Sequence, residues 1–165
     1  MAIGAGGVDL GTLQSSGAAP KLLRASKTFT GAANLGATGA NELFTTTGVV
    51  RVEQFSVYCA TTLVDAVDGA TFDLGTPGDT SILWSQGALD LDLIVTGAWI
   101  REGAPGSVQA GFTDAEYSYL VALSDNIIMT ISTQAITGGV LEFYVLWRSL
   151  SADGNLALGA GMVAI

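Results

Sequence analysis

Carboxylates are the side chains of this sequence that offer the widest choice of chemistry. Asp90 and Asp92 are two residues apart and therefore share one face of a strand. Two carboxylates at a suitable separation are what glycoside hydrolysis requires. The same spacing is typical of a solvent-facing strand edge. Histidine, the commonest general base, does not occur in the chain, and no hydrolase, phosphate-loop or zinc-protease motif accompanies the pair. We therefore expect a protein that is not an enzyme and has no catalytic residues.

A second group of carboxylates surrounds Gly69. Asp65, Asp68 and Asp73 flank it, and Asp79 follows on the next expected turn. Calcium prefers several oxygen ligands from flexible loops, which makes it the ion to consider here. The EF-hand spacing is missing, however, and Asp-Gly is a common turn dipeptide in its own right. The pattern predicts turns, with no metal ligands and no cofactor.

Cys59 is the one cysteine of the chain, so it cannot form an internal disulfide. Without histidine it also has no imidazole to activate it as a nucleophile or to share a zinc site. It follows Phe55 and Val57 on an alternating stretch, and free cysteine is among the most buried residue types. We expect a buried strand residue.

The tryptophans are candidates for binding, because exposed Trp and Tyr can hold sugars or protein partners. Trp84 and Trp147 lie within apolar stretches, which predicts that they pack in the core. Trp99 stands just before a Gly- and Pro-containing loop, and we expect it to be an interface anchor.

Short strands separated by turn residues position these side chains. Apolar and polar residues alternate over 49–59, 70–74, 89–95, 117–123 and 127–131, with a short apolar stretch at 82–84. Gly-, Pro- and Asp-rich turns separate them, and residues 137–139 are expected to form a hairpin-like break. Seven or eight such strands without helical periodicity predict an all-β protein, an antiparallel β-sandwich that is jelly-roll-like.

Two strands carry more specific expectations. Val50 and Val52 fall on one parity and Phe55 and Val57 on the other, so an extra residue near Glu53, a β-bulge, is needed to bring them to one face. Residues 140–147 are apolar on both parities apart from Glu142. This pattern predicts a central strand covered on both sides.

The first forty residues are crowded with Gly, Ala, Ser and Thr, and small side chains offset little of the cost of ordering a backbone. We therefore predict three parts: an extended N-terminal arm (1–40), a β-sandwich body (41–150) and a tail that contacts neighbouring subunits (151–165). The residues expected to hold the arm and body against a partner are Ile3, Val8, Leu10, Leu13, Lys21, Leu22, Leu23, Arg24, Lys27, Phe29 and Trp99.

Composition favours assembly with other protein chains. Hydrophobic residues make up 49% of the chain and charged residues 13%, about half the usual charged share. The longest uncharged apolar stretch is too interrupted to cross a membrane, and no secretory signal is evident, so we expect synthesis in the cytoplasm and no membrane partner. The net charge is −9, and basic residues are too few to bind nucleic acid.

Residues 42–52, 70–80 and 140–154 resemble small structural proteins of tailed bacteriophages. In size and plan the chain is similar to capsid decoration (cement) proteins, which have a short N-terminal arm and a small β domain. The resemblance implies homotrimers on the surface of the phage head, with the major capsid protein as partner and the arm adding to a sheet by β-augmentation. The tail from residue 151 departs from that plan.

The expected function is that of a virion structural protein which binds and stabilises the assembled head. The alternative is a receptor-binding module of the tail tip or fibre that recognises a host glycan or protein through its loops. The number of copies per particle separates the two.

Overall fold

The described part of the chain is built almost entirely of β-strands. The computed structural model describes residues 19–85, 91, 94–101, 108–109 and 121–165. The strands are β1 (Lys21–Thr28), β2 (Gly39–Thr47), β3 (Val50–Asp65), β4 (Thr71–Gly75), β5 (Trp84–Ser85), β6 (Trp99–Arg101), β7 (Val108–Gln109), β8 (Val121–Leu123), β9 (Ile127–Ser132), β10 (Ile136–Ser149), β11 (Asn155–Leu158) and β12 (Met162–Ala164).

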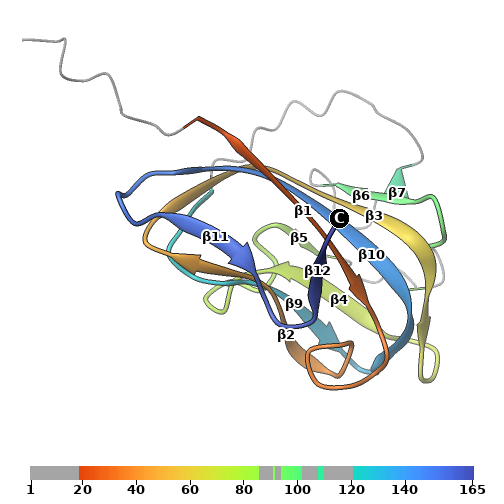
Figure 1. Cartoon of the computed structure of the whole chain (residues 1–165). Helices are drawn as coiled ribbons and strands as arrows, with labels where there is room; N and C mark the ends of the chain where they lie inside the picture. The colour runs from red at the N-terminus through yellow and green to blue at the C-terminus, as the bar shows by residue number, and fades with distance from the viewer. Residues whose placement is uncertain (1–18, 86–90, 92–93, 102–107, 110–120) are drawn as a thin grey trace, which may run out of the picture.

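In these residues the strands form two antiparallel sheets that lie in two layers (Figure 1). The seven-stranded sheet has the order β12-β1-β10-β3-β6-β7, with β8 also paired to β3. The five-stranded sheet has the order β11-β2-β9-β4-β5. The predicted all-β antiparallel sandwich is confirmed, while jelly-roll connectivity stays a prediction.

Three phenylalanines join the layers at the centre of the core. Phe44 comes from the five-stranded sheet, and Phe55 and Phe143 come from neighbouring strands of the seven-stranded sheet. Each pair meets edge to face, with ring centroids 6.2 to 6.4 Å apart. Edge-to-face contact places the positive ring edge against the negative ring face, which adds to the gain from burial. Trp84, Trp147 and Cys59 are buried as predicted.

The predicted bulge lies at Glu53. Leu146 pairs with Gln54 and Trp147 pairs with Val52, so Glu53 is the extra residue on β3. The bulge brings the residues before and after it to the same buried face, as the sequence pattern requires. The Glu53 carboxylate, which the bulge turns outward, lies 2.5 Å from Nε of Arg148.

The predicted central strand at residues 140–147 is confirmed, but the predicted break before it at residues 137–139 is wrong. β10 pairs with β1 on one side and β3 on the other, and it runs through residues 137–139 without a hairpin break. Gly139 has φ +101° and a Cβ there would lie 2.6 Å from the carbonyl oxygen of Thr62. Glycine is thus required for close approach of β3 rather than for a turn, and the chain reverses earlier, around Thr133.

The expected boundaries at residues 40 and 151 differ from the structure. Residues 21–28 form β1, which pairs along its whole length with β10 inside the body's own sheet. Residues 155–158 and 162–164 form β11 and β12, which extend both sheets of the same chain. The alternation of β1 is carried by Ala25 and Lys27, two residues that a search for large apolar side chains does not notice. Residues 1–18 lie outside the described part.

Lys27 connects the two sheets from within the core. Its side chain is fully buried, and its ammonium donates hydrogen bonds to the carbonyl oxygens of Glu42 (2.8 Å) and Ala160 (3.0 Å). Burial lowers the pKa of Lys27 from 10.5 to about 8, against the opposing attraction of the Glu42 carboxylate. The ammonium therefore fixes the chain that leads into β12 against β2.

The lowered pKa of Lys27 predicts stability that rises in mild alkali. The folded protein binds fewer protons than the unfolded chain between pH 8 and 10.5, so the free energy of unfolding increases as the pH rises through this range. We expect a gain of about 1 kcal/mol from pH 8 to 9 relative to Lys27→Met, measured by urea unfolding. Burial raises the pKa of Cys59, which has the opposite effect but is common to both proteins. Equal pH dependence in the two would contradict the prediction.

Candidate functional site

The outer face of the seven-stranded sheet is the most unusual surface of the described residues. Along β1 and β10 every second residue points into the core, and the residues between them point away from it. Register places these outward residues in rows that cross the sheet. We call the following set the outer patch: Val163 of β12, Leu22 and Arg24 of β1, Glu142, Tyr144 and Leu146 of β10, Tyr58 of β3 and Trp99 of β6.

Aromatic rings and one charged pair form the centre of the outer patch. The Trp99 ring lies 5.0 Å from that of Tyr58 and 5.6 Å from that of Tyr144, measured between centroids. The Arg24 guanidinium lies 5.4 Å from the centroid of the Tyr144 ring. The Tyr144 hydroxyl donates a 2.6 Å hydrogen bond to Glu142, and this bond raises the pKa of Tyr144 above its usual value. The phenol therefore keeps its proton and holds the Glu142 carboxylate in place.

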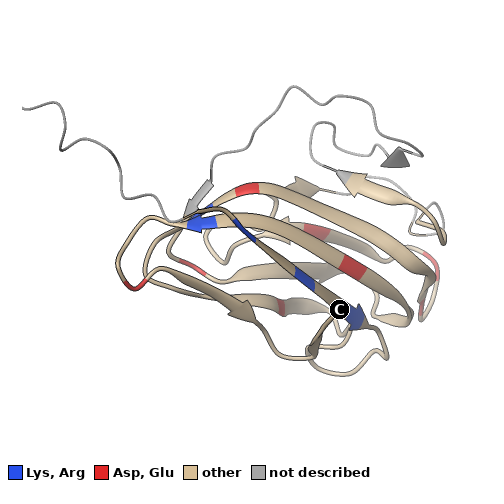
Figure 2. Cartoon of the chain, turned by 45° about the horizontal axis from the view of Figure 1, so that its top comes forward, with Lys and Arg blue, Asp and Glu red and all other residues tan. Residues whose placement is uncertain are grey.

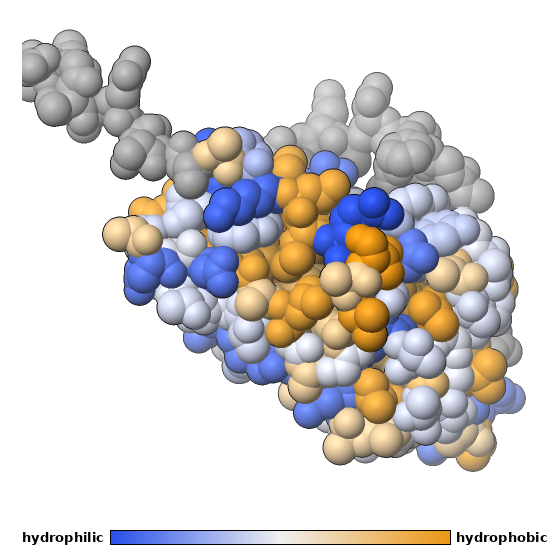
Figure 3. Space-filling model, in the orientation of Figure 1, coloured by the Kyte–Doolittle hydropathy of each residue, from blue (hydrophilic) through white to orange (hydrophobic). Residues whose placement is uncertain are grey.

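Apolar side chains flank this centre and are open to solvent. Leu22 is 60% exposed on β1, and Val163 is 64% exposed on the edge strand β12. Figure 3 shows hydrophobic residues gathered over β1, β10 and β12, on the face turned to the viewer. Contiguous apolar surface of this kind marks interaction sites.

The outer face of the five-stranded sheet has a different composition and provides an internal comparison. Thr45 pairs with Ala157, and Asp73 pairs with Thr130, all on the side away from the buried Phe72. Small polar residues of this kind are typical of a solvated face. Protein interfaces instead concentrate Tyr, Trp and Arg, which are the residues of the outer patch. The two outer faces thus differ in composition: the five-stranded sheet presents mainly small polar residues beside the buried Ile128, and the seven-stranded sheet presents Tyr, Trp and Arg.

Basic residues are also distributed unevenly between the two sheets. All six basic residues of the chain lie on strands of the seven-stranded sheet, and Figure 2 shows the described blue segments in that layer alone. Acidic residues occur on both sheets and in the connecting turns. Lys27 is buried and adds nothing to the surface, so the other basic residues are what make the seven-stranded sheet the less repulsive layer for an acidic partner in a chain of net charge −9. The basic residues are Lys21, Arg24, Lys27, Arg51, Arg101 and Arg148.

The structure places the predicted interface residues in three groups. Leu22, Arg24 and Trp99 belong to the outer patch, whereas Lys21 pairs with the core residue Trp147 and lies over its ring, outside the patch. Lys27 and Phe29 are buried in the chain's own core, and Leu23 is partly buried against it, because alternate residues of β1 face inward and Phe29 follows that strand. The remaining residues, Ile3, Val8, Leu10 and Leu13, lie outside the described residues.

Sequence reasoning did not single out five residues of the outer patch: Tyr58, Glu142, Tyr144, Leu146 and Val163. The signal that could have found Tyr144 and Leu146 was the apolar pattern on both parities of residues 140–147. Among the described residues that strand is covered on one side alone, and its outward residues are half-buried. The second cover that the pattern predicted is therefore not supplied by the described residues of this chain.

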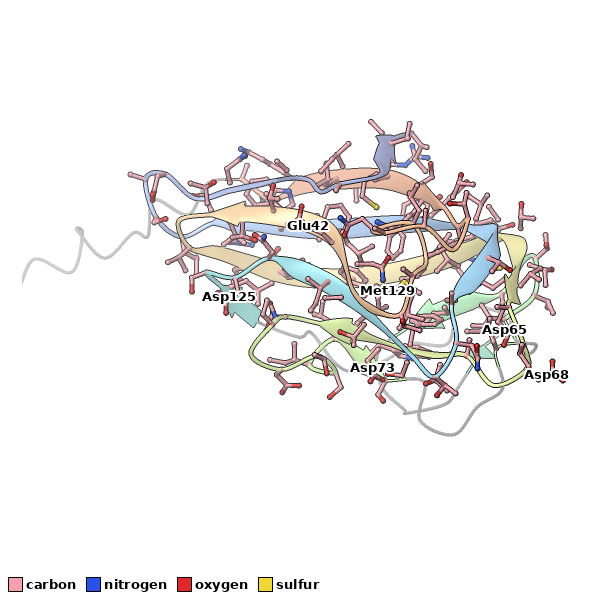
Figure 4. All side chains as sticks on the ribbon, turned by 90° about the horizontal axis from the view of Figure 1, so that it is seen from below. Glu42, Asp65, Asp68, Asp73, Asp125 and Met129 are labelled. Carbon is pink, nitrogen blue, oxygen red and sulfur yellow. The ribbon has the colours of Figure 1, made fainter. Side chains whose placement is uncertain are left out.

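The carboxylates considered for calcium serve local turns. Asp65 accepts a 3.0 Å hydrogen bond from the Ala70 amide, and Asp73 accepts a 2.6 Å bond from the Ser85 hydroxyl. Figure 4 shows Asp65 and Asp68 at one end of the sandwich and Asp125 at the other. Among the described residues, no three acidic or cysteine side chains come together as a metal site. Asp90 and Asp92 lie outside the described residues.

No helix in the described ranges is long and apolar enough to cross a membrane. Comparison with protein-family models, with curated proteins and with solved structures found no match to this chain. The outer patch, the charge division and the sequence patterns are therefore the observations from which function is argued.

Proposed function

We propose that this protein is a non-catalytic structural subunit of a tailed-phage particle, a decoration protein that binds and stabilises the assembled head. The outer patch is the observation that carries the proposal. It presents Trp, Tyr and Arg beside exposed Leu and Val, whereas the opposite sheet presents mainly Thr and Asp. The resemblance of residues 42–52, 70–80 and 140–154 to phage structural proteins supports the assignment to a virion.

Two regions of the chain are assigned to two partners in this scheme. The N-terminal segment, residues 1–18, binds the major capsid protein, because its scattered apolar residues suit an arm that is held by a neighbouring protein. The outer patch contacts another copy of the chain. Several arms that engage the shell at once raise the affinity well beyond that of one arm.

Removal of residues 2–18 tests the role of the arm. We expect attachment to undecorated heads to weaken by ~100-fold, since avidity through several arms is lost. The deletion stops before Lys21 because β1 begins there and pairs along its whole length with β10. Co-sedimentation of the truncated and full-length proteins with heads measures the effect.

Thermal unfolding of the truncated protein provides the control and should match that of the full chain, because β1 is intact. Unchanged attachment to heads would contradict the role of the arm. A count of copies in purified particles tests the location: a number comparable to that of the major capsid protein supports a shell component, and a handful supports the tail-tip alternative.

A further inference from the structure

We propose that the outer patch packs against the outer patch of a second copy of this chain, related by a two-fold axis, so that each Arg24 meets the partner's Glu142. The inference deepens the proposed function and rests on it, because it names the self-contact of the decorating subunit. It departs from the homotrimer that the phage resemblance implies.

The size of the face suits a modest dimer. Five strands, β12, β1, β10, β3 and β6, lie side by side across the patch. At about 4.8 Å between strands and about 20 Å of strand length, the face measures about 500 Å² per copy, or about 1,000 Å² for a pair. Specific interfaces begin near this value. The exposed Leu22 and Val163 provide the apolar area that becomes buried.

The charges at the centre of the patch complement a second copy. Arg24 pairs in register with Tyr144, and Glu142 pairs with Ser26, so the cation and the anion lie on neighbouring strands, two residues apart along the sheet. A partner that buries the patch must supply an anion opposite Arg24 and a cation opposite Glu142, because an unpaired buried charge is costly. The outer patch of a second copy, facing the first, supplies both the anion and the cation.

The two charged side chains are held ready for this contact. Arg24 lies over the Tyr144 ring, and Glu142 accepts the hydrogen bond of the Tyr144 hydroxyl. Side chains fixed before association lose less conformational entropy when they bind. Tyr144 thus orients both members of the pair.

Two-fold symmetry follows from this pairing. In an isologous contact residue i meets residue j while j meets i, so two equal pairs form at once and the assembly closes as a dimer. The axis lies in the plane of the interface and passes between Arg24 and Glu142. Strands of the two copies then cross steeply, which is one of the two common ways in which sheets pack face to face.

Charge reversal of the full chain tests the pairing. Arg24→Glu and Glu142→Arg each place like charges across the interface, and we expect each to weaken self-association at least ~30-fold in sedimentation velocity. An equimolar mixture of the two variants should associate as tightly as the unaltered protein, because each pair across the mixed interface again joins opposite charges. Restored association in the mixture would show that the two charges meet between copies, because a contact within one chain is not restored by mixing.

Asp68→Arg is the matched control for Glu142→Arg. It changes the net charge equally, but Asp68 lies in the exposed turn between β3 and β4, so association should be unaffected. Thermal unfolding establishes that the variants fold. If a reversal unfolds the chain, the neutral variants Arg24→Gln and Glu142→Gln take its place, and each is expected to weaken association at least ~10-fold. Unweakened association would then overturn the inference.

A mixture that stays as weak as its components, or a trimer as the associated form, would overturn the inference. So would an unaltered protein that remains monomeric at high concentration. Head attachment is measured separately on the same variants. Attachment without dimerisation refutes this inference and supports the proposed function. Dimerisation without attachment supports the contact between copies and refutes the proposed function.

Discussion

Replacement of Phe143 by alanine is expected to lower the free energy of unfolding by about 3–5 kcal/mol. The side chain is fully buried and meets both Phe44 and Phe55 edge to face, so its loss leaves a cavity between the two sheets. The sheets have little room to close around it, because Phe44 and Phe55 are themselves fixed by β2 and β3. Urea unfolding monitored by tryptophan fluorescence measures the loss.

Tyr144→Ala provides the control for Phe143→Ala. Tyr144 is the next residue on β10 and points away from the core, so its truncation should cost the monomer less than about 1 kcal/mol. Both proteins are compared at low concentration, where self-association does not contribute. Similar losses for the two variants would contradict the assignment of inner and outer faces on β10.

The inner face of the sandwich could be predicted from sequence because its signals are local. The parity change between Val52 and Phe55 required a bulge, and the structure has it at Glu53. The apolar pattern of residues 140–147 indicated a central strand for the same reason. An alternating pattern shows which residues of a strand share a face. A bulge or a buried strand changes that pattern within a few residues, so it can be recognised from the local sequence.

The outer patch could not be predicted because it depends on pairing between distant segments. Leu22 and Leu146 are cross-strand neighbours, and Val163 lies opposite Ser26, four residues further along β1, through the pairing of β12 with β1. Nothing local in residues 21–28 distinguishes a strand from an arm, since the inward residues of β1 include an alanine and a lysine. Lys27 enters the core because carbonyl oxygens of Glu42 and Ala160 receive its ammonium, and these lie far away in sequence.

The central claim is that the outer patch, rather than the opposite face, is the surface through which this chain assembles. A matched pair of substitutions, Leu22→Asp and Ala157→Asp, separates the two faces. Both residues are exposed, on β1 and on the edge strand β11 respectively, and both changes add one negative charge. Only the first places an unpaired carboxylate in the apolar part of the proposed contact.

Sedimentation velocity over a range of concentrations is the measurement that tests this claim most directly. We expect the unaltered protein and Ala157→Asp to associate alike, and Leu22→Asp to associate at least ~30-fold more weakly, since a desolvated unpaired charge costs several kcal/mol. Equal association by all three proteins, or a loss confined to Ala157→Asp, would contradict the account.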